Sequence, residues 1–182
     1  IGNENITTMS GIITTGGRAA NGIENIGNTN TTTVSGSITT EGDNAYGIYN
    51  LGSNNVTTVS GSIKTAGNNS HGINIYGDNN TTSISGTVKA TGTKSAALYN
   101  KSGSGNSFTL NEGATIIGDI LARDATNNAF DATNSKLIFN LGASTSYAYS
   151  VSGKGEGTGG GQWIFSDLDR SSQVVTTSGT GC

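Results

Sequence analysis

The stretch TTVSGSIKTAGNNSHGI, from Thr57 to Ile73, has almost no charge, no proline, and an apolar residue only every few positions. This spacing fits neither an amphipathic helix nor the thick core of an ordinary globular domain. The same words return elsewhere: TTMSGIITTGG begins at Thr7, TTVSGSITTEG at Thr32 and TTSISGTVKATG at Thr81. Self-similarity at a fixed period is the signature of a repeat architecture, so this repeat decides the fold.

The four copies keep step without a single insertion. When they are aligned on the Ser-Gly pair, glycines recur every 25 residues in three separate columns. Copies in such register predict stacked units of about 25 residues each. The columns are Gly11, Gly36, Gly61 and Gly86; Gly17, Gly42, Gly67 and Gly92; and Gly22, Gly47 and Gly72, with Ala97 in the last copy.

Columns that contain only apolar residues are expected to form the core, and columns that tolerate any residue are expected to face solvent. Between them, threonine, serine and isoleucine favour strands, while glycine and asparagine favour turns, so each copy is interpreted as three short strands. The apolar columns are Met9, Val34, Val59 and Ile84; Ile13, Ile38, Ile63 and Val88; and Ile23, Ile48, Ile73 and Leu98. The variable columns are Asn21, Tyr46, His71 and Ala96, and Gly16, Glu41, Ala66 and Thr91.

One unit buries too few apolar side chains to fold alone, but stacking pairs each of its strands with the units above and below. The sequence therefore predicts an all-β fold, a parallel β-helix (β-solenoid) of about six or seven coils. Residues 1–103 are expected to form four regular coils. Residues 104–182 are expected to form divergent coils with longer loops, or a cap or junction segment. A leucine-rich repeat has a similar period, but leucine is scarce here.

The divergent part still contains strand patterns. Residues 106–122, NSFTLNEGATIIGDILA, are interpreted as a variant coil, and further strands are expected in SKLIFNLG (135–142), in YAYSVSG (147–153) and around Trp163 to Phe165. The inward residues expected for the variant coil are Phe108, Leu110, Ile116 and Ile120.

Composition argues against several classes of function. The net charge is −3 and the nine lysines and arginines are scattered, whereas nucleic-acid binding needs a basic face. The chain has one histidine and one cysteine, Cys182, too few for a zinc site, and it lacks the glycine-aspartate words of calcium-binding repeats. No apolar run approaches the roughly 18 residues of a transmembrane helix. We therefore expect no cofactor, no metal and no nucleic-acid partner.

The words VSGSITTEGDNAYGIYNLGSNN (34–55) and KLIFNLGASTSYAYSVSGKGEG (136–157) resemble the passenger domains of bacterial autotransporters, which are exported by type V secretion. The resemblance extends over nearly the whole chain. It implies a right-handed parallel β-helix, export through the outer membrane, display at the cell surface, and a role in adhesion or aggregation. It also implies a parent protein anchored by a C-terminal membrane barrel that is missing from this sequence. No catalytic motif of the family can be placed on this chain.

These observations predict a structural or adhesive surface rod, extracellular on a bacterial cell, rather than an enzyme. Its expected partners are a host receptor, a glycan or a sister-cell surface protein, and self-association is a further expectation. Contact is expected from aromatic and histidine side chains at the variable outer corners, since these have no evident core role. The candidate contact residues are Tyr46, Tyr49, His71, Tyr76 and Tyr99.

Three alternatives stay open. The first is a self-assembling filament or surface-layer subunit. The second is an ice-binding protein, because three threonine files recur with the repeat: Thr7, Thr32, Thr57 and Thr82; Thr8, Thr33, Thr58 and Ser83; and Thr15, Thr40 and Thr65. The third is a polysaccharide-degrading β-helix enzyme, with acids such as Asp167 and Asp169 in SDLDR on one outer face.

Overall fold

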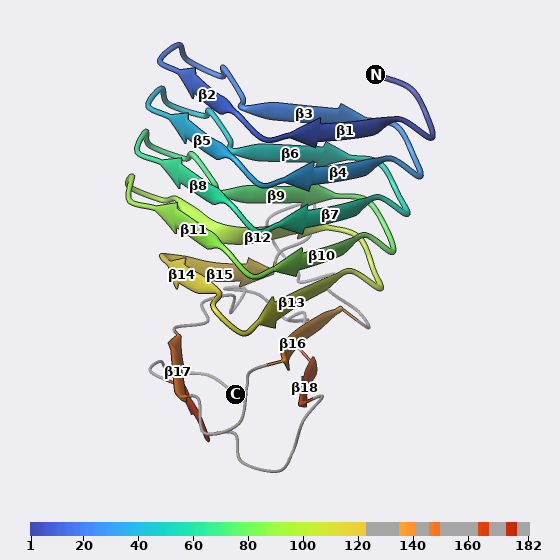
Figure 1. The fold of residues 1–182 in the computed structure, drawn as a ribbon, viewed down its shortest axis with the longest axis vertical. Coiled ribbons are helices and arrows are strands. Elements are labelled where there is room, and N and C mark those ends of the chain that lie inside the picture. Colours follow the sequence, from blue (N-terminus) through green and yellow to red (C-terminus); the bar gives the residue numbers. More distant parts are fainter. Residues whose placement is uncertain (123–134, 141–145, 150–163, 168–173, 178–182) are drawn as a thin grey trace, which may run out of the picture.

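The computed structural model describes residues 1–122, 135–140, 146–149, 164–167 and 174–177, with side chains in 1–121 and 135–140. The secondary structure of these residues consists of strands, stacked in parallel sheets as a β-solenoid of about five turns. As the chain descends from its N-terminus in Figure 1, strands of the near face run leftward and strands of the far face run rightward. The coil is therefore right-handed, as predicted.

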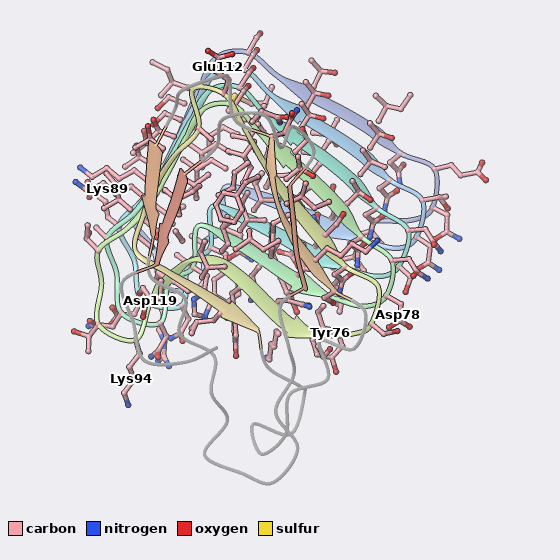
Figure 2. The ribbon with its side chains drawn as sticks, turned by 90° about the horizontal axis from the view of Figure 1, so that it is seen from below. Tyr76, Asp78, Lys89, Lys94, Glu112 and Asp119 are labelled. Carbon is pink, nitrogen blue, oxygen red and sulfur yellow. The ribbon has the colours of Figure 1, made fainter. Side chains whose placement is uncertain are left out.

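Each turn contributes one strand to each of three sheets, which form the faces of a triangular coil (Figure 2). Sheet A contains β1 (Ile6–Met9), β4 (Thr31–Val34), β7 (Val56–Val59), β10 (Thr81–Ile84), β13 (Ser107–Asn111), β16 (Lys136–Asn140) and β18 (Ile164–Asp167). Sheet B contains β2 (Ile12–Thr15), β5 (Ser37–Thr40), β8 (Ser62–Thr65), β11 (Thr87–Ala90) and β14 (Thr115–Ile117). Sheet C contains β3 (Ile23–Ile26), β6 (Ile48–Leu51), β9 (Ile73–Tyr76), β12 (Ala96–Ser102) and β15 (Asp119–Ala122).

The register of the sheets follows the sequence repeat. Val34 lies directly opposite Val59 on the neighbouring strand, which is the pairing that the 25-residue period requires. Beyond the fourth copy the step changes, since Thr81 pairs with Ser107. Sheet A has seven strands but sheets B and C have five each, so the described residues form fewer complete turns than the six or seven predicted. Strands β17 (Ser146–Tyr149) and β19 (Val174–Thr177) pair separately as sheet D.

The apolar columns form one continuous core, as predicted. Val34, Val59 and Ile84 are fully buried, and only the first coil departs from this, where Ile13 is half-buried at the solenoid's end. The variant coil follows the same rule, because Phe108, Leu110 and Ile120 are fully buried and Ile116 packs against the core.

The glycine columns mark places where successive coils touch. A Cβ atom on Gly36 would overlap the carbonyl oxygen of Gly11 in the coil before it, and the same clash recurs between Gly61 and Gly36. Neither glycine has a positive φ, so close approach of backbone rather than backbone conformation requires glycine here. Coils can therefore stack at the spacing of a β-sheet only if these corners carry no side chain.

Buried asparagines form a second, polar connection between coils. The Asn30 side-chain oxygen accepts a hydrogen bond from the Asn5 backbone N–H at 2.8 Å, and Asn55 and Asn80 repeat this contact one and two coils later. Asn106 continues the file, accepting from the Asn80 backbone N–H at 2.7 Å. This ladder was not predicted, although its asparagines recur every 25 residues through the four copies.

Candidate functional site

The outer face of sheet C carries a cluster of aromatic rings, formed by Tyr46, Tyr49, His71 and Tyr99 and called here the aromatic cluster. The rings of Tyr46 and His71 stack at 5.4 Å with an interplanar angle of 17°. The centre of the Tyr49 ring lies 5.4 Å from that of Tyr46, and the centre of the Tyr99 ring lies 4.3 Å from that of His71. Centroid separations of this size are typical of favourable aromatic pairs, so the rings support one another.

Strand register explains why these residues meet. Side chains alternate along a strand, so Ile73 and Ile75 of β9 point into the core while Asn74 points outward. Tyr49 and Tyr99 lie directly opposite Asn74 on the neighbouring strands β6 and β12. Three coils therefore contribute to this outer column, in which the strands of Tyr49 and Tyr99 are two ladder steps apart and Asn74 lies on the strand between them.

His71 is 7% exposed, which corrects the prediction that it lies at a solvent-exposed corner. Its ring nitrogen Nδ1 accepts a hydrogen bond from the Ala96 backbone N–H at 3.0 Å. Asn21 has the same role one step earlier in the column, since its side-chain oxygen accepts from the Tyr46 backbone N–H at 2.8 Å. Ala96 itself is fully buried. The column that looked free of constraint thus contributes to contacts between coils.

The position of the histidine proton follows from this contact. A nitrogen that accepts a hydrogen bond carries no proton, so the Nδ1 contact corresponds to the imidazole tautomer with its proton on Nε2. The ring therefore acts as a structural support between Tyr46 and Tyr99.

Asn74 lies beneath the rings with 1% of its surface exposed, and its side-chain oxygen has no hydrogen-bond partner. Burial raises the pKa of the Tyr46 hydroxyl above its usual 10.0, and a hydrogen bond with the Asn74 side chain lowers it in part. Burial also raises the pKa of Tyr49, with smaller contributions from Tyr46, Glu24 and Tyr76. Both phenols therefore stay protonated at neutral pH and can donate hydrogen bonds to a partner.

Tyr76 lies at the end of the same face, at the corner between sheets C and A, where Figure 2 shows it near Asp78. The Lys101 ammonium is 5.7 Å from the centre of its ring, within the range of a cation–π contact. All five predicted contact residues therefore belong to one face. Tyr46, Tyr49 and Tyr76 are half-buried and can meet a partner, whereas His71 and Tyr99 are largely buried, which corrects the expectation for those two.

Two of the three threonine files are internal. Thr32, Thr57 and Thr82 are fully buried, so the file that begins with Thr7 faces the core. Thr40 and Thr65 are also fully buried, and their hydroxyls donate to backbone carbonyls five residues ahead. The expectation that these two files form an outer surface is wrong. The remaining file lies on the outer face of sheet A and consists of Thr8, Thr33, Thr58 and Ser83.

The charged side chains labelled in Figure 2 lie at separate corners and faces of the coil. Asp167 ends β18, but its side chain is not among those described, and Asp169 lies outside the described residues. Within the part of the chain that the structure describes, no three His, Cys, Asp or Glu side chains are grouped so that they could hold a metal. The described residues also include no helix with the length and hydrophobicity needed to cross a membrane.

Comparison of the chain with protein-family models, with curated proteins and with solved structures finds no match.

Proposed function

We propose that this solenoid is a surface-displayed structural and adhesive rod of a bacterial cell, and that it makes contact through the outer face of sheet C. The observation that carries the proposal is the aromatic cluster, in which partly exposed tyrosines are held by rings beneath and beside them. Tyrosine is enriched in protein contact surfaces because it offers a large apolar area and a polar hydroxyl at little entropic cost.

The solenoid makes this surface rigid. Each tyrosine is attached to a strand or corner paired on both sides, and side chains such as Asn21 and His71 tie adjacent coils together. A partner that binds such a face loses little free energy to ordering the protein. The expected partners are a host receptor, a glycan or a sister-cell surface protein, and the half-buried tyrosines and the Lys101 side chain offer the polar contacts.

The experiment is adhesion of protein-coated beads to a cultured epithelial-cell monolayer, together with binding to a printed glycan array. The double variant Tyr46→Ala with Tyr49→Ala is expected to lose at least about tenfold in binding, since aromatic anchors dominate contact energies. The matched control changes Thr33→Ala and Thr58→Ala on sheet A and is expected to bind as the unchanged chain does. Equal binding by both double variants, with intact β-sheet circular dichroism, would reject sheet C as the contact face.

Ice binding is a weaker candidate, because only one of the three threonine files faces outward. In that file Thr8, Thr33 and Thr58 are followed by Ser83, which lacks the methyl group of threonine. We expect no thermal hysteresis at millimolar protein concentration. Thermal hysteresis that disappears in the Thr33→Ala and Thr58→Ala double variant would instead favour ice binding over adhesion.

A further inference from the structure

His71 is the chain's one histidine, and it lies where the third and fourth coils meet on the outer face of sheet C. Its side chain is 7% exposed, and Nδ1 accepts a hydrogen bond from the backbone N–H of the buried Ala96. Histidine is the side chain that ordinarily changes its charge between pH 5 and pH 8. A mild change of pH therefore acts on this face through His71.

The contact with Ala96 requires that Nδ1 carry no proton. An imidazolium has a hydrogen on both nitrogens and accepts no hydrogen bond. Its Nδ1–H would face the Ala96 N–H, so the ring has to turn away and leave that amide without its side-chain acceptor. A buried N–H that loses its acceptor is costly. Ala96 begins β12, so the loss falls on the joint between two coils.

The same movement would loosen the tyrosines of the aromatic cluster. The imidazole stacks on Tyr46 with ring centres 5.4 Å apart, and the centre of the Tyr99 ring lies 4.3 Å from its own. Tyr49 packs in turn against Tyr46. A ring that turns away from the Ala96 amide gives up its stacking on Tyr46, and the half-buried tyrosines of the face lose a support.

Four charged side chains of the described residues flank this region. They are Asp119 on β15, Glu24 on β3, Lys94 at the corner before β12, and Lys101 near the end of β12 (Figure 2 labels Asp119 and Lys94). Asp119 lies opposite Ala96, so its rung is two ladder steps, roughly 10 Å, from that of His71. The two carboxylates favour a charged imidazole and the two ammonium groups oppose it, while the tyrosine rings are uncharged in this range of pH.

The direct contact outweighs these flanking charges. Opposite charges in equal number largely cancel, and separations beyond the Debye length of about 8 Å are screened at physiological salt. The Tyr46 ring attracts a cation, but that attraction returns no acceptor to the Ala96 amide. The folded chain therefore disfavours a proton that the unfolded chain takes up near pH 6.5. Stability that depends on His71 is then full above about pH 6.5 and is lost as the pH falls.

We propose that His71 makes the contact face of sheet C sensitive to acid, so that the face is ordered at neutral pH and loosens when the imidazole is protonated. The effect on binding rests on the proposed function, whereas the effect on the stability of the face does not.

The repeat itself supplies the matched control. Asn21 occupies the same column and accepts the Tyr46 backbone N–H at 2.8 Å. His71→Asn therefore keeps an acceptor for Ala96 that does not titrate, while His71→Ala removes the acceptor at every pH.

The first test compares urea unfolding of these chains at pH 7.5 and pH 5.0. The midpoint of the unchanged chain should fall by about 0.5 M more than that of His71→Asn. His71→Ala should already have a lower midpoint than the unchanged chain at pH 7.5, and its shift with pH should match that of His71→Asn. Equal shifts in the unchanged chain and His71→Asn would overturn the proposal.

A nuclear magnetic resonance titration follows the proton directly, because the chain's single imidazole gives one Cε1–H signal. The midpoint of that titration is expected below about pH 6.5, the value of an exposed imidazole. A midpoint at or above this value would show that the folded chain accepts the proton readily, and would overturn the proposal.

The last test measures binding of coated beads to a chemically fixed epithelial-cell monolayer at both pH values. The unchanged chain should lose at least about threefold more binding at pH 5.0 than His71→Asn does. Equal losses would overturn acid control of the contact. If no chain binds at pH 7.5, the adhesive role fails, and the urea and resonance measurements still decide whether His71 makes the face acid-sensitive.

Discussion

The buried threonine file of sheet A allows a test in which one substitution should have opposite effects on neighbouring rungs. Thr57 and Thr82 face each other on adjacent strands and both are fully buried. The Thr57 hydroxyl accepts a hydrogen bond from the Asn50 side-chain amide at 2.9 Å. The Thr82 hydroxyl has no partner. Ile75 explains the difference, because it stands seven residues before Thr82, where an asparagine precedes Thr57 by the same interval.

We expect Thr82→Val to stabilise the protein. Valine has nearly the same shape as threonine and replaces the unpaired hydroxyl with a methyl group. A buried polar group without a partner costs about 1–3 kcal/mol, so the free energy of unfolding should rise by about 1 kcal/mol, allowing for imperfect packing of the new methyl. Valine also suits the strand at least as well as threonine does.

Thr57→Val should do the reverse. It leaves the Asn50 amide buried without an acceptor, and the free energy of unfolding should fall by about 1–3 kcal/mol. The two variants carry the same chemical change in the same file, so β-propensity and side-chain volume cancel between them. Their difference should be at least about 2 kcal/mol.

The assay is urea unfolding followed by far-ultraviolet circular dichroism, with the midpoint and the slope compared for both variants. Long repeat arrays can lose cooperativity, so equal slopes are needed before midpoints are converted to free energies. Shifts of the same sign in the two variants would refute the reasoning, since the hydrogen-bond partner is the only feature that separates them.

Further predictions concern ionisation, the asparagine ladder and catalysis. Burial raises the pKa values of Tyr46 and Tyr49, so the stability that these groups contribute is fully present below pH 10 and is lost as pH rises through their folded-state pKa values. In a pH titration followed by phenolate absorbance, two tyrosines should ionise late, and the variants Tyr46→Phe and Tyr49→Phe should each remove one of them. Asn80→Ala should lower the free energy of unfolding by about 1–3 kcal/mol, measured by urea unfolding, because it leaves the Asn55 amide N–H without its side-chain acceptor. The chain should not cleave pectin-like or glycosaminoglycan polysaccharides in a product-absorbance assay, and turnover abolished by Asp167→Asn would restore the enzyme alternative.

The repeat made the fold predictable because each coil repeats the same apolar positions. The columns of Val34 and Ile38 had one chemical property in common, and the period alone placed their members on adjacent rungs. The internal threonines were missed because threonine is also a typical solvent-facing strand residue. Side chains alternate between the two faces of a strand, so Thr32, two residues before the core residue Val34, must point into the core as well. This alternation would have identified the internal threonines.

The roles of His71 and the aromatic cluster could not be read in this way. Asn21, Tyr46, His71 and Ala96 share no size, charge or polarity, so their column looked unconstrained. The role of each residue depends on the neighbouring coil. Asn21 and His71 accept hydrogen bonds from backbone amides of the next coil, and Tyr46 stacks on the ring of His71. Such contacts depend on a pair of coils, whereas the column was read one residue at a time.

Stacking coils with hydrogen bonds directed along the axis has a mechanical consequence. Tension applied between the two ends pulls on the bonds of the outermost turn one after another, while the turns behind it remain closed. Each turn released changes from one ladder step into about 25 residues of extended backbone, a gain of roughly 80 Å. A rod of this kind would lengthen in discrete increments under load and could rewind when the load falls, acting as a tether that yields gradually.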